Sequence, residues 1–197
     1  MRRRLYVARM SENLRTYTKA IYAFDHVLKS ANEKAFTRKA PCTGWTGKDV
    51  YEHGLGSAKM IHAFATTGKA PKSSPKLGAD PLGTWIKLRD QALAALDQPG
   101  VLHSIAHDPF GPDFGSMPLD DLVGFMAAEL TVHVWDMART AKVDERLEPA
   151  LVKFSHATWK TLPDAVLRSP GMMGAAIKPA AGADAQTKWL NFLGRAV

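Results

Sequence analysis

Apolar residues recur along most of the chain at the spacing of amphipathic helices. Between Ser11 and Ala31 they alternate at steps of three and four residues, which places them on one face of a helix. The residues of this stripe are Leu14, Tyr17, Ile21, Phe24 and Leu28. The pattern predicts an all-α protein whose first regular element is a long helix.

A second long helix is predicted over about residues 47–67. Thr46 stands directly before it and Asp49 follows three residues later, which is close to the capping box that starts many helices. At helical spacing, His53 falls on the apolar face of this segment rather than on its polar face. We therefore expect a histidine that points inward among core residues.

Two more long helices are predicted, with a short extended segment between them. The third covers residues 82–96 and ends before the turn signal Gln98-Pro99-Gly100. Residues 101–117 then read as a small hairpin. Pro118 suits the first position of a fourth helix that continues to about residue 142, because proline lacks the N–H that this position leaves unpaired.

The rest of the chain is predicted to be a short irregular and helical extension. Helices are expected at about residues 145–162 and 185–193, with an irregular segment rich in proline, glycine and alanine between them. A chain of 197 residues has the length of one ordinary domain. The expectation is one domain over residues 1–197, with its core in residues 11–142 and the extension in residues 143–197.

Composition narrows the function classes. Hydrophobic residues make up 46% and charged residues 23% of the chain, the mixture of an ordinary globular protein. No segment approaches the roughly 20 apolar residues that cross a bilayer, and the arginines at positions 2–4 do not precede a signal-peptide core. The single cysteine, Cys42, cannot form an internal disulfide, so a cytoplasmic protein with no membrane partner is expected. The net charge of +7 is scattered, which predicts no specific nucleic-acid partner.

The fourth helix carries a carboxylate and an imidazole on its apolar face. Glu129 and His133 are four residues apart and therefore point the same way. Taken alone, this pair is explained well by a hydrogen-bonded Glu/His pair in the core. His53 changes the balance, because helical bundles build metal sites from side chains on facing helices. Two imidazoles and one carboxylate are three ligands of the kind that catalytic zinc sites use, with a fourth position free. The predicted ligands are His53, Glu129 and His133.

Other polar residues receive weaker roles. Asp136 and Arg139 extend the ligand helix by a turn, and Asp136 either orients a ligand histidine or pairs with Arg139. Cys42 is either a reactive thiol or, more commonly for a lone cysteine, a small buried or half-buried hydrophobe. The remaining histidines are expected in surface or local hydrogen-bonding roles; they are His26, His62, His103, His107 and His156.

The sequence resembles the DinB-like metal-binding bundles, most closely the N-terminal domain of mycothiol-dependent maleylpyruvate isomerases and its stand-alone relatives. The motifs that carry the resemblance are Pro41-Cys42-Thr43-Gly44-Trp45-Thr46 with Asp49-Val50-Tyr51-Glu52-His53, then Glu129-Leu130-Thr131-Val132-His133-Val134-Trp135-Asp136-Met137-Ala138, and the tail Phe192-Leu193-Gly194-Arg195. The resemblance implies an up-and-down four-helix bundle. It also implies a divalent metal on His53, Glu129 and His133, with zinc expected first and nickel, manganese or iron as alternatives.

The function implied by the resemblance is thiol chemistry. A metal-bound thiolate, from mycothiol in that family, would attack a small electrophile; substitution would make the protein a transferase and reversible addition a cis-trans isomerase. The isomerases carry a further sterol-carrier-like C-terminal domain, whereas the residues after about 142 look like the tail of the stand-alone relatives, so maleylpyruvate isomerisation itself is not expected. The expected partners are a small-molecule thiol and an electrophilic substrate, and a homodimer is left open. A metal-dependent hydrolase and a non-catalytic metal-binding or stress-response module are the alternatives.

Overall fold

The computed structural model describes residues 10–197 and is mostly helical, which confirms the all-α class. The elements are α2 (Glu12–Ser30), η1 (Glu33–Thr37), α3 (Gly47–Thr67), α4 (Pro81–Leu96), η2 (Val101–His103), β1 (Ile105–Ala106), β2 (Met117–Pro118), α5 (Leu119–Ala141), α6 (Pro149–Trp159), α7 (Asp164–Leu167) and α8 (Ala185–Phe192). The arginines at positions 2–4 lie outside the described residues. Among residues 10–197, none of the helices has the length and apolar character needed to cross a membrane.

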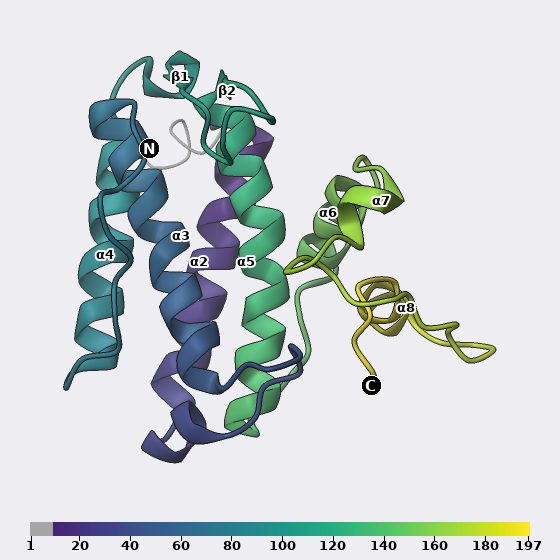
Figure 1. Ribbon diagram of the computed structural model, residues 1–197. Helices are drawn as coiled ribbons and strands as arrows, with labels where there is room; N and C mark the ends of the chain where they lie inside the picture. The colour runs from purple at the N-terminus through teal and green to yellow at the C-terminus, as the bar shows by residue number, and fades with distance from the viewer. Residues whose placement is uncertain (1–9) are drawn as a thin grey trace, which may run out of the picture.

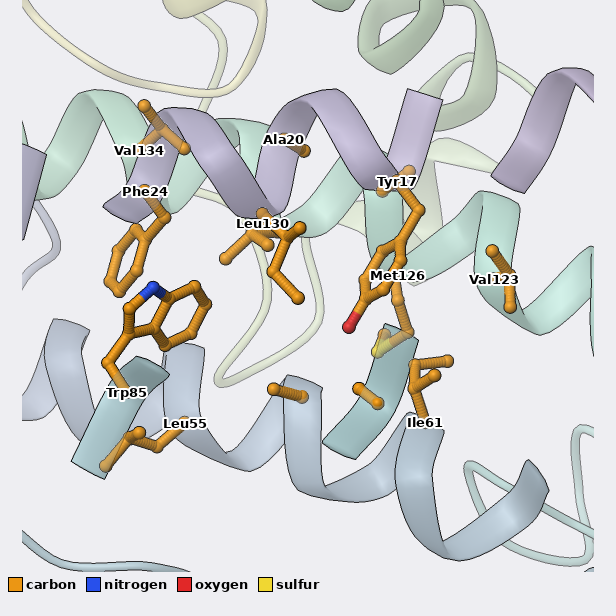
Figure 2. Packing of buried hydrophobic residues seen from close by; sticks show 14 of the residues in the cluster. Tyr17, Ala20, Phe24, Leu55, Ile61, Trp85, Val123, Met126, Leu130 and Val134 are labelled. Carbon is orange, nitrogen blue, oxygen red and sulfur yellow. The ribbon is translucent and has the colours of Figure 1, made fainter. Parts of the chain in front are cut away.

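The four longest helices, α2, α3, α4 and α5, lie side by side around one hydrophobic core (Figure 1). Figure 2 shows how each helix contributes to this core: Phe24 comes from α2, Leu55 from α3, Trp85 from α4 and Leu130 from α5. All four side chains are fully buried, and burying each one contributes about 1.5–3 kcal/mol. This core fixes the positions of α3 and α5, the two helices that carry the predicted ligands.

Helix α5 is buried on almost all sides. One face packs on α2 and α3, and the other packs on the C-terminal helices, which Figure 1 places beside α5 and away from α4. The second contact forms a separate hydrophobic cluster that includes Trp135, Trp159 and Trp189. Because it packs on both the other long helices and the C-terminal helices, α5 is the central helix of the described residues.

The start of α3 follows the capping prediction. The carboxylate of Asp49 accepts hydrogen bonds from the backbone N–H of Thr46 at 2.8 Å and from its hydroxyl at 2.7 Å. Gly47, the first residue of the helix, allows a close approach, since a Cβ there would lie 2.1 Å from the carbonyl oxygen of Ala35. The cap thus sets where α3 begins, six residues before His53 on the chain and next to η1.

Three boundary predictions need correction. The predicted hairpin exists, but each of its strands, β1 and β2, is only two residues long. The pairing of Ile105 with Pro118 places Pro118 in β2. Pro118 is therefore the strand residue before α5 and not its first helical residue. The helix predicted over residues 145–162 is limited to α6, which starts at Pro149, and the segment predicted to be irregular contains the short helix α7.

Candidate metal centre

The three predicted ligands converge in space. His53 lies in the first half of α3, and Glu129 and His133 lie in the middle of α5. One ligand atom of each lies within 4.8 Å of the others. The Nε2 atom of His53 contacts Oε1 of Glu129, and Nε2 of His133 is 3.4 Å from the same oxygen. The structure thus brings together all three residues that the sequence singled out as ligands.

The three side chains differ in exposure. The side chains of Glu129 and His133 are 10% and 9% exposed, whereas that of His53 is 45% exposed. The expectation of an inward His53 is therefore only partly right: its ring reaches the other two ligands from the rim. As a result, the centre has a closed side on α5 and an open side at His53.

Two further residues, Ser57 and Trp45, contact the predicted ligands. The sequence had suggested no role for either of them. The hydroxyl of Ser57 donates a hydrogen bond of 2.7 Å to Oε2 of Glu129. The indole of Trp45 stacks on His133 with ring centroids 5.7 Å apart and 11° between the planes, and it also contacts His53. Ser57 follows His53 by four residues on the same helix face, so spacing could have identified it.

The charges at the centre favour an ionised carboxylate between two imidazoles. Burial acts to raise the pKa of Glu129, but His53 and His133 outweigh it and hold that pKa well below its ordinary value. Burial acts to lower the pKa of His133, but the neighbouring carboxylates of Asp136 and Glu129 outweigh it and raise that pKa well above the usual range. The centre therefore attracts positive charge.

Asp136 lies behind His133, on the side away from Glu129. Its Oδ2 atom is 3.1 Å from Nδ1 of His133, although the N–H is not well aligned for a hydrogen bond. It pairs with Arg195 and accepts a hydrogen bond from the thiol of Cys42 at 3.1 Å. Burial acts to raise the pKa of Asp136, but His133 and Arg195 lower it to about 2. Asp136 is thus a fully buried, ionised carboxylate in contact with a predicted ligand.

Arg139, the other candidate on this helix turn, does not join the centre. Its guanidinium pairs with Glu145 at 2.7 Å and lies over the ring of Trp135 at 4.9 Å from the centroid. The proposed alternative pairing of Asp136 with Arg139 is therefore wrong, because Arg195 takes that place. Cys42 is half-buried, as the commoner expectation allowed, but its thiol also donates a hydrogen bond to Asp136 and so is more than a packing residue.

The donor atoms suit a divalent ion such as zinc. Two imidazole nitrogens and one carboxylate oxygen face one another, and the exposed rim leaves room for an exogenous ligand. Cys42, Asp136 and Nδ1 of His133 form a second group of possible ligands. A cation already lies there, because Nη2 of Arg195 is 3.0 Å from Asp136 Oδ2 and 3.2 Å from the sulfur of Cys42. The first group is therefore the better metal site.

Comparison with known proteins finds relatives that are themselves uncharacterized. The chain is 26% identical over 172 residues to uncharacterized proteins from two strains of Mycobacterium tuberculosis, and the matched region covers 84% of this chain and 87% of each relative. No family model matches the chain. Among solved structures, none matches at a significant level. The similarity extends over most of both chains.

Proposed function

We propose that this chain is a DinB-like metal-binding helical bundle in which His53, Glu129 and His133 bind one divalent cation, most simply zinc. The convergence of these three donors from two helices is the observation that carries the proposal. The four long helices around one core support the bundle architecture. Nickel, manganese and iron are the alternative metals, since imidazole and carboxylate ligands suit each of them.

We further propose that the protein is a thiol-dependent transferase or isomerase that acts on a small electrophile. When bound, the ion would lower the pKa of a small-molecule thiol, mycothiol by the family resemblance, and so supply a thiolate at neutral pH. A site with a single carboxylate ligand keeps a net positive charge, which favours an anionic ligand at the open position. The partners are then a small thiol and an electrophile.

The residues of the chain have defined tasks in this proposal. Ser57 and the two imidazoles hold the carboxylate of Glu129. Trp45 covers the rings of His53 and His133, which limits the access of water to that side. The exposed edge of His53 leaves the site open to a small molecule. A hydrolase is the weaker candidate, because Asp136, an acid close to the ligands, is committed to Arg195 and is not free to act as a general base.

Metal content of purified variants tests the ligand assignment. His53→Ala and His133→Ala should lower the bound zinc strongly, because two remaining ligands hold a metal poorly, whereas the matched control His156→Ala should bind as the wild type does. Elemental analysis measures the zinc content of each variant, and chelator competition measures its zinc affinity. Equal zinc content in all three variants would reject the assignment.

Thiol consumption tests the reaction. The metal-loaded protein is incubated with mycothiol and a panel of small electrophiles, and free thiol and products are followed. Consumption of thiol that requires both protein and metal supports the transferase. Cis-trans isomerisation of the electrophile that requires metal and thiol, but leaves the thiol concentration unchanged, supports the isomerase. Turnover without any thiol would favour a hydrolase, and metal binding without turnover would favour a non-catalytic module.

A further inference from the structure

Arg195 is buried although it stands only two residues from the end of the chain. Its exposed fraction is 7%, and arginine is rarely buried unless it is paired. Its Nε atom donates to Oδ1 of Asp136 at 3.1 Å and its Nη2 atom to Oδ2 at 3.0 Å. This two-point contact is the geometry in which arginine holds a carboxylate most firmly.

The turn after α8 delivers Arg195 to this position. Gly194 adopts a φ of +77°, which favours glycine, and a Cβ there would lie 2.7 Å from the backbone of Gly174. The backbone N–H of Arg195 then donates to the carbonyl of Leu190 at 2.8 Å, and its Nη1 donates to the carbonyl of Leu193 at 3.2 Å. The tail is thus fixed with its guanidinium directed inward.

Asp136 connects this guanidinium to a predicted metal ligand. Its Oδ2 atom lies 3.1 Å from Nδ1 of His133, while Nε2 of the same ring faces Glu129. A carboxylate beside the nitrogen that does not bind metal fixes the orientation of a ligand histidine and the nitrogen that it presents. Without Arg195, Asp136 would be a buried carboxylate with no full counter-charge, which is costly.

We propose that Arg195 is a positioning residue that orients His133 through Asp136, so that the C-terminal tail completes the metal centre. This inference rests on the proposed metal-binding function. Loss of such an outer partner of a ligand typically lowers metal affinity about 10- to 100-fold. Cys42, which contacts both Asp136 and Arg195, supports the same arrangement from the loop before α3.

The test is the zinc affinity of full-length variants, measured by competition with a chromophoric chelator. Arg195→Met should bind zinc about 10- to 100-fold more weakly than the wild type. Arg195→Lys should lose less, because it restores the charge but not the two-point contact. Asp136→Asn should weaken binding as Arg195→Met does, and the double variant should lose little more, because both residues act through one path. Cobalt substitution adds a second measurement, since the visible spectrum reports the coordination geometry of the metal, which should change in Arg195→Met and stay the same in the control below.

Arg168→Met is the matched control, because Arg168 holds the same extension without touching the centre. Its Nη2 donates to the carbonyl of Phe192 at 2.9 Å. This variant should lower the melting temperature but leave zinc affinity unchanged. Wild-type affinity in Arg195→Met, or an equal loss in Arg168→Met, would overturn the inference while the proposed function stands. A wild-type protein that binds no zinc, cobalt, nickel, manganese or iron would overturn both.

Discussion

The state of the Glu129 carboxylate decides what the candidate centre can bind. One of its oxygens faces the imidazoles of His53 and His133, and the other accepts the hydroxyl of Ser57. A buried polar atom that loses its partner costs about 1–3 kcal/mol. Ser57 therefore has two effects: it satisfies one carboxylate oxygen, and it keeps the other turned toward the imidazoles.

The variant Ser57→Ala separates these effects. The metal-free protein should lose about 1–3 kcal/mol of unfolding free energy, because a carboxylate oxygen is left without a donor. Zinc affinity should fall about 10-fold or more, because the carboxylate is no longer oriented. Urea unfolding and chelator competition measure the two quantities.

Ser155→Ala is the matched control for that prediction. Ser155 is also a buried hydroxyl, and it donates to the backbone carbonyl of Ala128 at 2.8 Å rather than to a ligand side chain. The control should lose stability but keep its zinc affinity. If Ser57→Ala bound zinc as tightly as this control, Ser57 would not orient the carboxylate.

At the scale of residues, the sequence predicts those features of the candidate site that follow from spacing along a single helix. Glu129 and His133 are four residues apart on one helix, so their common direction follows from helix geometry. Arg195 and Cys42 reach Asp136 from 59 and 94 residues away, and no periodicity connects such positions. The exposed edge of His53 was also missed, because an apolar stripe shows the face of a helix but not how far that face is covered.

At the scale of elements, the capping box at the start of α3 joins that helix to the preceding loop, which carries Cys42 and Trp45. The hydrogen bonds from Thr46 outweigh burial and lower the pKa of Asp49. The capping contribution is therefore fully present above the ordinary pKa of an aspartate, and it is lost as the pH falls through the lowered value.

The variant Asp49→Ala should lower the free energy of unfolding by about 1 kcal/mol at neutral pH, the usual effect of losing a cap. The difference from the wild type should shrink in acid, because protonation removes the same contacts. Urea unfolding at neutral and acidic pH measures it, with the exposed residue Asp113 changed to alanine as the control. A difference that grows toward acidic pH would contradict the role of the ionised carboxylate.

The long helices were predicted closely, and the extension less well, for a physical reason. The first helix was expected between Ser11 and Ala31 and spans Glu12–Ser30, because its cap and its apolar stripe agree. The helix predicted over residues 145–162 is shorter, since Leu147 and Leu162 pack against the second cluster from outside α6. Apolar spacing there marks contact with this cluster and not helical structure.

At the scale of the whole molecule, the candidate centre joins α3 to α5 across their shared core. A metal that binds only the folded protein stabilises it by mass action, by about 2.7 kcal/mol at a free concentration 100 times the dissociation constant. Zinc should therefore raise the melting temperature of the wild type, and a chelator should reverse the change. His133→Ala should show neither effect in calorimetry; an equal zinc-induced rise in that variant would place the metal elsewhere.

The burial of α5 between two hydrophobic clusters has a kinetic consequence. Backbone amides in the middle of α5 should be among the slowest to exchange with solvent, because they open only with the whole fold. Glu129 and His133 thus lie on a helix that is buried on almost all sides, whereas the side chain of His53 is 45% exposed. Entry and escape of an ion should accordingly depend on rotation of the His53 ring, which is fast compared with any opening of the core.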